Sequence, residues 1–562
     1  MSDKPAANVR NYRSIVLAAL VLLAALCVVH FWTNAGPKGG PQTAITISEE
    51  TTRITGPLDA QGYVDYLRAI NDQLATGVTA ENNFEVVLRR VVGPHPIQPE
   101  HRAEYHRMLG IDELPCDGDY LLDYQGFVIC EENPDLNRAM ICSEKELRVP
   151  SEELQKEENR LVSAPWGPED NPRAGRWLEE IDDQLDTIVE GSRRPRHYSP
   201  YLPANAKTPA KGPRLLDVQL PSAQTQRRVA VALLARVMFR IRQGELDTAW
   251  SDLQAIRRMA RHVDQGGYTV LEGLVGIAMD ANAWKGECSI IASERLTVEE
   301  ARRYLGDLMA LKPVGSTANK IDFGERYAGL DAVQEIAEQG VDEIHRWFFG
   351  YGRLRPSGSK PTSSILQDVG NLVANGKAAG ADWNVAMKRA NERYDQLVEV
   401  ARESDPAKQL AEFRRLEAER GDILRRNRFL GTVILSGTTS RALGESAGEV
   451  VSAYLAPAIA TSVLADRISA SRLETMRTAF ALRLYQFEHS EFPESMDRLV
   501  PLYLSSVPLD AVTGKPLFYR RTNDGCVVYG VGRNRRDDGG FGDEDKPELS
   551  PRPDDVVVRV PN

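Results

Sequence analysis

The chain lacks the short motifs that mark the commonest catalytic and cofactor-binding sites. Its 562 residues contain no HExxH zinc motif, no GxxxxGK(S/T) phosphate loop and no GxGxxG sequence after an expected strand. The six cysteines include no CxxC pair and the eight histidines are scattered, so no zinc site is indicated. The motifs of this chain therefore assign no reaction to it.

Acidic residues outnumber basic residues in this chain. The sequence has 69 Lys+Arg against 80 Asp+Glu, for a formal net charge of −11. Nucleic-acid binding depends on a basic surface, so this balance argues against nucleic acid as a partner. Glycine (43) and proline (32) are too few for a collagen or a globally disordered chain. The length allows several domains with cores that need no disulfides.

Long apolar runs are missing as well, with one exception near the N-terminus. Ile15–Trp32 is a run of eighteen residues without Asp, Glu, Lys or Arg. That length is close to the ~20 residues that a bilayer core requires. Lys4, Arg10 and Arg13 precede the run and only Lys38 follows it closely. The positive-inside rule therefore predicts a cytoplasmic N-terminus and an extracytoplasmic remainder.

A cleaved signal peptide is the main alternative to an anchor. Thr33-Asn34-Ala35 could serve as the cleavage site, but the apolar region of a signal peptide is normally only ~7–15 residues long. A lipoprotein is disfavoured because Leu26 precedes Cys27, where a small residue is needed. We expect residues 1–35 to form a cytoplasmic stub and a transmembrane anchor, followed by a linker over residues 36–56.

Three of the cysteines, Cys116, Cys130 and Cys142, lie within 27 residues of each other. A disulfide is chemically allowed outside the membrane, and Cys130–Cys142 is the pairing we expect first. Free buried thiols are an equally open alternative. This cluster belongs to a mainly helical N-terminal region that we place at residues 57–165.

The middle of the chain has the apolar spacing of packed helices. Short turns between such helices predict antiparallel hairpins. The turn at Gly244 resembles that of a tetratricopeptide hairpin, but no second copy follows at a 34-residue spacing. We therefore expect a helical body over residues 166–445 with one such hairpin. Four apolar residues recur at steps of four before the turn: Val229, Leu233, Val237 and Ile241.

Gly444, Ser446 and Gly448 form a G-x-S-x-G pattern, which occurs at the nucleophile elbow of serine hydrolases. That elbow requires a sharp strand-to-helix turn, with an acid and then a histidine downstream. Here the upstream chain is helical and only His489 follows. We expect these small residues to form a close helix contact or a loop instead.

From residue 457 onward the pattern becomes mixed. An apolar stripe with mostly 3–4-residue steps predicts one long amphipathic helix from Pro457 to His489. Asn523-Asp524-Gly525 predicts a hairpin turn between the first two of three strand-like runs. We expect the helix to cover a small antiparallel sheet. Its strands are Leu517–Arg521, Cys526–Val531 and Val556–Val560.

The expected fold class is mainly α. It comprises an N-terminal transmembrane helix, a multi-helix extracytoplasmic body and a small C-terminal α+β module over residues 446–562. That module combines a long helix with a three-stranded antiparallel sheet.

The C-terminal module also carries a specific order of motifs. The order is Tyr485…Glu491-Phe492-Pro493-Glu494-Ser495-Met496, then Val507-Pro508-Leu509-Asp510-x2-Thr513-Gly514-Lys515-Pro516, then Tyr529-Gly530-Val531-Gly532-x-Asn534…Asp537-Asp538-Gly539-Gly540…Asp554-Asp555-Val556. With this order and spacing, the segment resembles the globular domain of the type II secretion major pseudopilin.

In that family the loop before the last strand binds calcium, so the resemblance implies a calcium site in this chain. Ca²⁺ takes ~6–8 oxygen ligands from carboxylates and carbonyls, which suits an acidic loop. A solvated acidic loop without a metal is the alternative, and the loop is longer than the family usually shows. The candidate ligands are Asp537, Asp538, Asp543, Asp545, Asp554 and Asp555.

The chain departs from the pseudopilin family at its N-terminal end. Pseudopilins carry their domain directly after a methylated hydrophobic helix that bears a Glu. Here Ile15–Trp32 lies more than 400 residues upstream of the module, and it lacks both that Glu and the Gly-Phe processing site. We therefore expect neither processing by prepilin peptidase nor polymerisation as a pilus subunit.

The whole chain is similar to an uncharacterised family of large membrane-anchored bacterial proteins that end in this module. The resemblance implies an inner-membrane anchor with a periplasmic body, and it brings no activity with it. Its marks are Asp65-Tyr66-Leu67-x2-Ile70-Asn71, Gly77-Val78-Thr79-x-Glu81-Asn82-Asn83, Ser192-Arg193-Arg194-Pro195-Arg196-His197-Tyr198 and Gly324-Glu325-Arg326-Tyr327.

These features favour a non-enzymatic structural or interaction protein at the membrane. Its partners would be proteins bound through the helical body or through the C-terminal module, which calcium would stabilise. One alternative is an extracytoplasmic hydrolase with a site in the helical body or at Ser446. Another is an accessory protein of a type II secretion-like system that contacts pseudopilins through the shared module.

Overall fold

The computed structural model describes residues 45–135, 152–203, 215, 218–315, 317–339, 380–432, 440–455, 459–543, 545–546 and 548–562. Over these ranges the chain is mainly helical, with a small antiparallel sheet near the C-terminus, as the sequence predicts. No helix within them combines the length and the apolarity needed to cross a membrane. The expected anchor Ile15–Trp32, and Cys142 of the expected disulfide, lie outside the described residues.

The N-terminal region consists of short helices with well-defined caps. The side chain of Asn83 caps the start of α3, and Gly93 ends that helix with a φ of 75°. The side chain of Asn171 caps α8, which has Pro172 in its first turn. The helices are α2 (Tyr66–Ala75), α3 (Phe84–Val92), α4 (Arg102–Leu109), α5 (Tyr124–Glu132), α7 (Glu152–Leu161) and α8 (Pro172–Gly191), with a 3-10 turn, η1, at Pro99–His101.

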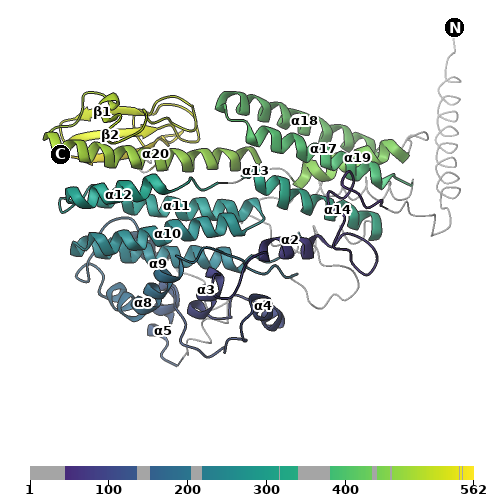
Figure 1. Ribbon diagram of the computed structural model, residues 1–562, viewed down its shortest axis with the longest axis horizontal. Helices are drawn as coiled ribbons and strands as arrows, with labels where there is room; N and C mark the ends of the chain where they lie inside the picture. Colours follow the sequence, from purple (N-terminus) through teal and green to yellow (C-terminus); the bar gives the residue numbers. More distant parts are fainter. Residues whose placement is uncertain are drawn as a thin grey trace, which may run out of the picture.

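The central helices pack as the predicted antiparallel hairpins. Gly244 ends α9 in the left-handed conformation, with a φ of 86°, and the chain turns directly into α10. Capping boxes at Thr269 and Thr297 fix where α11 and α12 begin. Figure 1 shows these helices lying side by side. Their bounds are α9 (Pro221–Gln243), α10 (Leu246–Gly266), α11 (Val270–Ile291) and α12 (Val298–Ala310).

Buried ion pairs run between these packed helices. The fully buried guanidinium of Arg257 lies 2.6 Å from Asp280 and 2.5 Å from Glu287. Arg236 of α9 lies 2.7 Å from Asp252 of α10. A buried charge is tolerated only when it is paired and hydrogen-bonded, so these pairs fix which helix faces meet.

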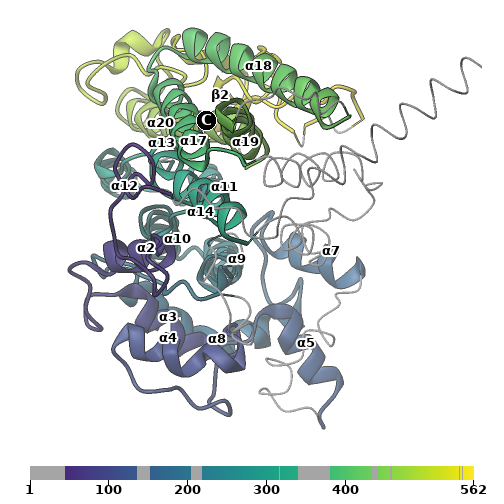
Figure 2. The ribbon, with the colours of Figure 1, turned by 90° about the vertical axis from the view of Figure 1, so that its right-hand side faces the viewer.

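A second helical group lies beside the first (Figure 2). In it α17 packs against both α14 and α19. Gly444 and Gly448 of α19 permit the close approach of α17, because a Cβ at either position would lie 2.2 or 2.3 Å from a backbone carbonyl oxygen of that helix or its N-cap. The elements are α13 (Thr317–Lys320), a π-helical turn η4 (Ile321–Glu325), α14 (Arg326–Gln339), α17 (Trp383–Arg402), α18 (Pro406–Thr432) and α19 (Ser440–Leu455).

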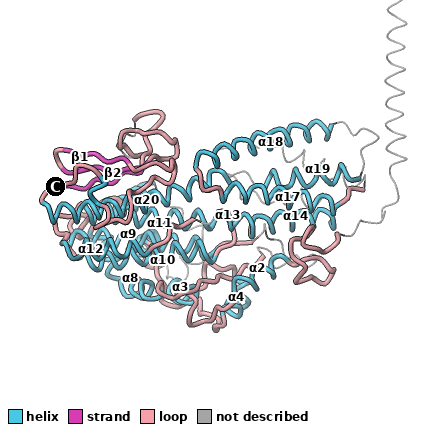
Figure 3. Tube along the Cα trace, turned by 45° about the horizontal axis from the view of Figure 1, so that its top comes forward, coloured by secondary structure: helices cyan, strands magenta, loops and turns pink. Residues whose placement is uncertain are grey.

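The C-terminal module has the predicted long helix, α20 (Ile459–His489), and the predicted sheet. A short 3-10 turn, η6 (Met496–Leu499), lies between them. The strands β1 (Phe518–Thr522), β2 (Gly525–Gly530) and β3 (Val556–Pro561) pair antiparallel in that order. Thr522 pairs with Gly525, so Asn523 and Asp524 alone form the hairpin loop. Figure 3 shows this sheet at one end of the molecule.

Helix α20 is buried on more faces than its single apolar stripe predicts. It lies between the sheet and the layer formed by α11 and α12 (Figure 1). The hydroxyl groups of Thr475 and Thr478 donate to carbonyls of their own helix, which makes their burial tolerable. The buried small polar residues are Ser462, Ser469, Ser471, Thr475 and Thr478. Because α20 packs against both layers, the C-terminal module shares its core with the helical body.

Candidate functional site

The loop between β2 and β3 carries all six aspartates of the expected calcium site. Gly539 and Gly540 lie at its centre with φ values of 76° and 77°, which L-residues with side chains rarely adopt. Their backbone N–H groups point to carboxylates: Gly539 donates to Asp537 (2.8 Å) and Gly540 to Asp555 (2.9 Å). The glycines therefore shape the loop around these acids.

Asp538 joins the two halves of the loop. Its Oδ2 accepts a hydrogen bond from the Asn534 side chain (2.7 Å) and another from the backbone N–H of Asp554 (2.9 Å). Its own backbone N–H donates to Oδ2 of Asp555 (3.0 Å). Asp554 in turn accepts from the backbone N–H of Asn534 (3.1 Å). The aspartates that stand 16 and 17 residues apart in the sequence thus lie next to each other.

Asp555 is the most deeply placed of the six, with 5% of its surface exposed. Its Oδ2 accepts two backbone hydrogen bonds, but its buried Oδ1 has no partner within the described chain. Burial, assisted by the nearby charge of Asp538, raises the pKa of Asp555 to about 6. Burial and neighbouring carboxylates also raise the pKa of Asp554. Close negative charges of this kind favour a cation or a proton among them.

The other predicted ligands have local roles. Asp537 accepts a hydrogen bond from the Tyr529 hydroxyl (3.1 Å). Asp545 accepts from the backbone of Gly542 (2.7 Å) and pairs with Arg559 (2.8 Å). Asp543 lines the cleft described below.

The structure thus brings Asp537, Asp538, Asp554 and Asp555 together. Asp543 lies near Asp554, whose pKa its charge helps to raise, and Asp545 is paired with Arg559. No group of three or more His, Cys, Asp or Glu side chains among the described residues has a ready-made metal-binding arrangement. Calcium also accepts backbone carbonyls, and the unpartnered Oδ1 of Asp555 offers it a carboxylate oxygen. This single oxygen is available to an oxygen-coordinated cation.

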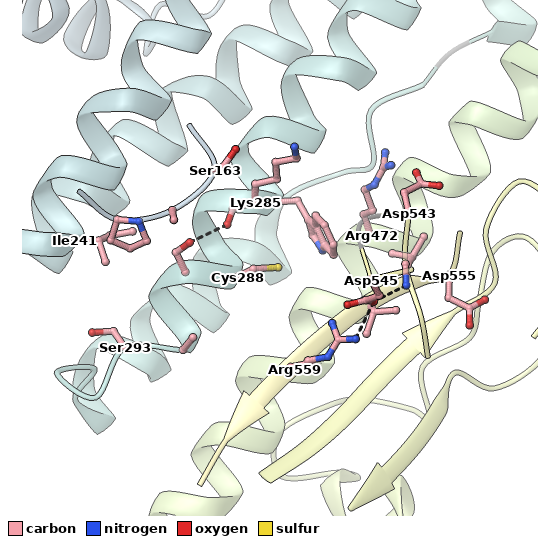
Figure 4. A pocket seen from close by; sticks show the side chains of 18 of the residues that line it. Ser163, Ile241, Lys285, Cys288, Ser293, Arg472, Asp543, Asp545, Asp555 and Arg559 are labelled. Atoms are coloured by element: carbon pink, nitrogen blue, oxygen red, sulfur yellow. Dashed lines mark hydrogen bonds and ion pairs between the residues drawn. The ribbon is translucent and has the colours of Figure 1, made fainter. Parts of the chain in front are cut away.

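A cleft of about 860 Å³ lies between this loop and the helical body. Figure 4 shows Lys285 and Cys288 on the α11 side, and Asp545, Asp555 and Arg559 on the sheet side. Trp284 of α11 and Arg472 of α20 also line it, as do Arg533 and Asp543 of the loop. The cleft could not be predicted from the sequence, because its walls come from five separate segments between Ser163 and Arg559.

Ser446 does not lie on a nucleophile elbow. It lies inside α19, so the strand-to-helix turn of a nucleophile elbow is missing at this position. The flanking Gly444 and Gly448 form the contact with α17 described above. The expectation of a close helix contact is confirmed.

Three of the segments that mark the whole-chain resemblance hold each other in place. Oδ1 of Asn83 accepts a hydrogen bond from the backbone N–H of Tyr198 (2.9 Å), and its Nδ2 donates to the Tyr198 carbonyl (2.9 Å). Asn71 accepts from the Tyr198 hydroxyl (3.0 Å) and from the backbone of Tyr201 (2.9 Å). Arg194 donates to the carbonyls of Ala80 (2.7 Å) and Asn83 (2.9 Å). These polar residues clamp the chain after α8 onto α2 and α3.

The Gly324-Glu325-Arg326 segment is structural as well. A Cβ at Gly324 would lie 1.8 Å from the Tyr268 carbonyl oxygen, so only glycine fits there. The buried Arg326 lies 2.7 Å from Asp395 and 2.9 Å from Asp322. Several of the residues that mark the whole-chain resemblance therefore stabilise contacts between helices and loops.

Comparisons with known proteins add no relative to this description. The family models, the curated proteins and the solved structures that were searched yield no match to the chain.

Proposed function

We propose that this protein is a single-pass, membrane-anchored extracytoplasmic protein that acts through protein–protein interaction or as a structural element. Its apolar N-terminal run would hold it in the inner membrane, with the helical body and the pseudopilin-like module in the periplasm. Calcium would stabilise the acidic loop of that module. The proposal draws on the charge pattern around Ile15–Trp32 and on the resemblance of the C-terminal segment.

One observation carries the calcium site: the buried Asp555 has an unpartnered carboxylate oxygen within a group of other aspartates. Asp538 and Asp554 lie beside it and Asp537 is close. A bound Ca²⁺ would supply the missing partner and neutralise the mutual repulsion of these carboxylates.

The test is calcium titration of the full chain by isothermal titration calorimetry. The full chain is needed because α20 packs against α11 and α12 as well as against the sheet. We expect binding that disappears in Asp555→Ala and persists in Asp524→Ala, a matched change in the exposed hairpin of the same module. Absence of calcium binding to the wild-type chain would leave a solvated acidic loop and remove calcium from the proposal.

A further inference from the structure

The cleft between α11, α20 and the acidic loop contains two arginines that form no ion pair with the described residues. Of the cations that line it, Arg242 pairs with Glu169 (3.2 Å) and Arg559 pairs with Asp545 (2.8 Å). Arg295 donates to the carbonyl of Gln243 (2.8 Å). These three guanidinium groups are therefore held by the protein itself.

Arg472 and Arg533 differ from them. Within the part of the chain that the structure describes, neither guanidinium makes a hydrogen bond or an ion pair. Arg472 projects from α20 beside the ring of Trp284, with 6.0 Å between the guanidinium carbon and the ring centroid. Burial, together with the positive charge of nearby Arg533, lowers the pKa of Arg472. Two like charges that converge on one cleft, one of them half-buried, favour an anion between them.

The carboxylates of the cleft do not supply that anion. Asp545 is paired with Arg559, while Asp554 and Asp555 accept backbone hydrogen bonds. Two carboxylates are near enough to favour the charged form of Arg472: Asp280, which is itself paired with Arg257 and Arg261, and then Asp543. Neither forms an ion pair with Arg472 within the described residues. Asp543 therefore opposes an added anion without replacing it.

The cleft wall also includes apolar and aromatic residues. Trp284 contributes its ring, and its buried indole N–H has no hydrogen-bond partner within the described chain. Ile468 and Val557 also line the cleft. A ligand that matches this cleft would combine one negatively charged head group with an apolar body.

We propose that this cleft binds a small organic anion, whose carboxylate or phosphate group pairs with Arg472 and Arg533 and whose apolar part lies against Trp284. The inference does not rest on the calcium site, because neither arginine is a proposed calcium ligand, but Asp543, Asp554 and Asp555 line the same cleft and a bound metal would change its charge. All measurements are therefore made in EDTA, which separates the outcome of this proposal from that of the calcium proposal.

The test uses three naphthalene compounds as probes, titrated into the full chain by isothermal titration calorimetry. 1-Naphthoate and 1-naphthyl phosphate carry the two candidate head groups, and 1-naphthalenemethanol is the uncharged control. We expect at least one anion to bind about tenfold more tightly than the alcohol, as one charge-assisted hydrogen-bond pair would give. The tighter of the two anions identifies the head group, and equal affinity of all three compounds contradicts the proposal.

Variants locate the binding site. Arg472→Gln and Arg533→Gln are each expected to weaken anion binding about tenfold and to leave binding of the alcohol unchanged. Arg533 is exposed, so its replacement tests the proposal even where the half-buried Arg472 affects folding. Arg242→Gln removes a cation of the same cleft that is already paired, and it should change little. Asp543→Asn should strengthen anion binding, because it removes the opposing charge near Arg472. Anion binding that survives both arginine replacements overturns the assignment.

Discussion

Replacing Asp555 by Asn should have opposite effects on stability with and without calcium. The amide oxygen can accept the two backbone hydrogen bonds that Oδ2 of Asp555 accepts now. The change removes the negative charge that lies buried among other aspartates. In EDTA at pH 7 the variant should therefore be more stable than the wild type, whereas it should lose the stabilisation that calcium gives.

The magnitude follows from the pKa of Asp555, which burial raises from 3.8 to about 6. A tenfold change in proton affinity corresponds to ~1.4 kcal/mol, so the charge lowers the free energy of unfolding by at most about 3 kcal/mol at neutral pH. Solvent near the loop reduces this to about 1–2 kcal/mol. The native state binds this proton more tightly than the unfolded chain does. Its contribution to stability is complete below about pH 4 and is lost as the pH rises through about 6.

The assay is urea unfolding of the full chain from pH 4 to pH 8, in EDTA and again in calcium. In EDTA the wild type should lose about 1–2 kcal/mol more than the variant between pH 4 and pH 7. In calcium the wild type alone should gain stability. Asp524→Asn, in the exposed hairpin, should follow the wild type throughout. A variant that is less stable than the wild type in EDTA, or that gains as much from calcium, would refute this reasoning.

Three further predictions concern the helical body. Gly448→Ala should lower the free energy of unfolding by about 1–3 kcal/mol, because its Cβ would lie 2.3 Å from a carbonyl oxygen of α17. The control, Gly421→Ala in α18, should be neutral or stabilising by about 0.5–1 kcal/mol. Equal shifts of the two urea midpoints would contradict this contact. Arg257→Met should destabilise by about 3–5 kcal/mol, because it leaves the buried Glu287 without its ion-pair partner and leaves Asp280 with Arg261 alone. Arg415→Ala, on an exposed pair, should stay within about 0.5 kcal/mol. Similar losses in the two variants would show that burial is not the cause. A fluorophosphonate probe should label the wild type no more than Ser446→Ala, and labelling that the variant abolishes would revive the hydrolase alternative.

Helix ends and hairpin turns were predictable because each depends on residues that lie close together in the sequence. Gly244 after a run of apolar residues at steps of four predicts the end of α9, and the structure ends the helix there. The turn residues Asn523 and Asp524 likewise predict the β1–β2 hairpin. The glycines of the G-x-S-x-G pattern allowed two interpretations, and the helical sequence before them favoured the correct one, a close helix contact.

Features that depend on tertiary packing were not predictable in the same way. The spacing of apolar residues shows one face of α20. Its burial also depends on α11 and α12, which precede it by more than 100 residues and cover it on the side away from the sheet. The six loop aspartates look equivalent in the sequence. Only the fold distinguishes Asp555, with its unpartnered oxygen, from Asp545, which is paired with Arg559. Arg472 and Trp284 form part of one cleft for the same reason, since nothing in either local sequence marks them as neighbours.

We propose above that the body of this protein lies outside the cytoplasm, and Cys116 offers a direct test of that location. Its thiol is exposed in the structure, so a membrane-impermeant maleimide can reach it wherever the body is accessible. The measurement is labelling of cells that express the chain, with the outer membrane permeabilised and the inner membrane intact, and with Cys116→Ser as the control. We expect the wild type to be labelled and the Cys116→Ser control to be labelled less. Labelling at Cys116 only after the inner membrane is lysed would contradict it.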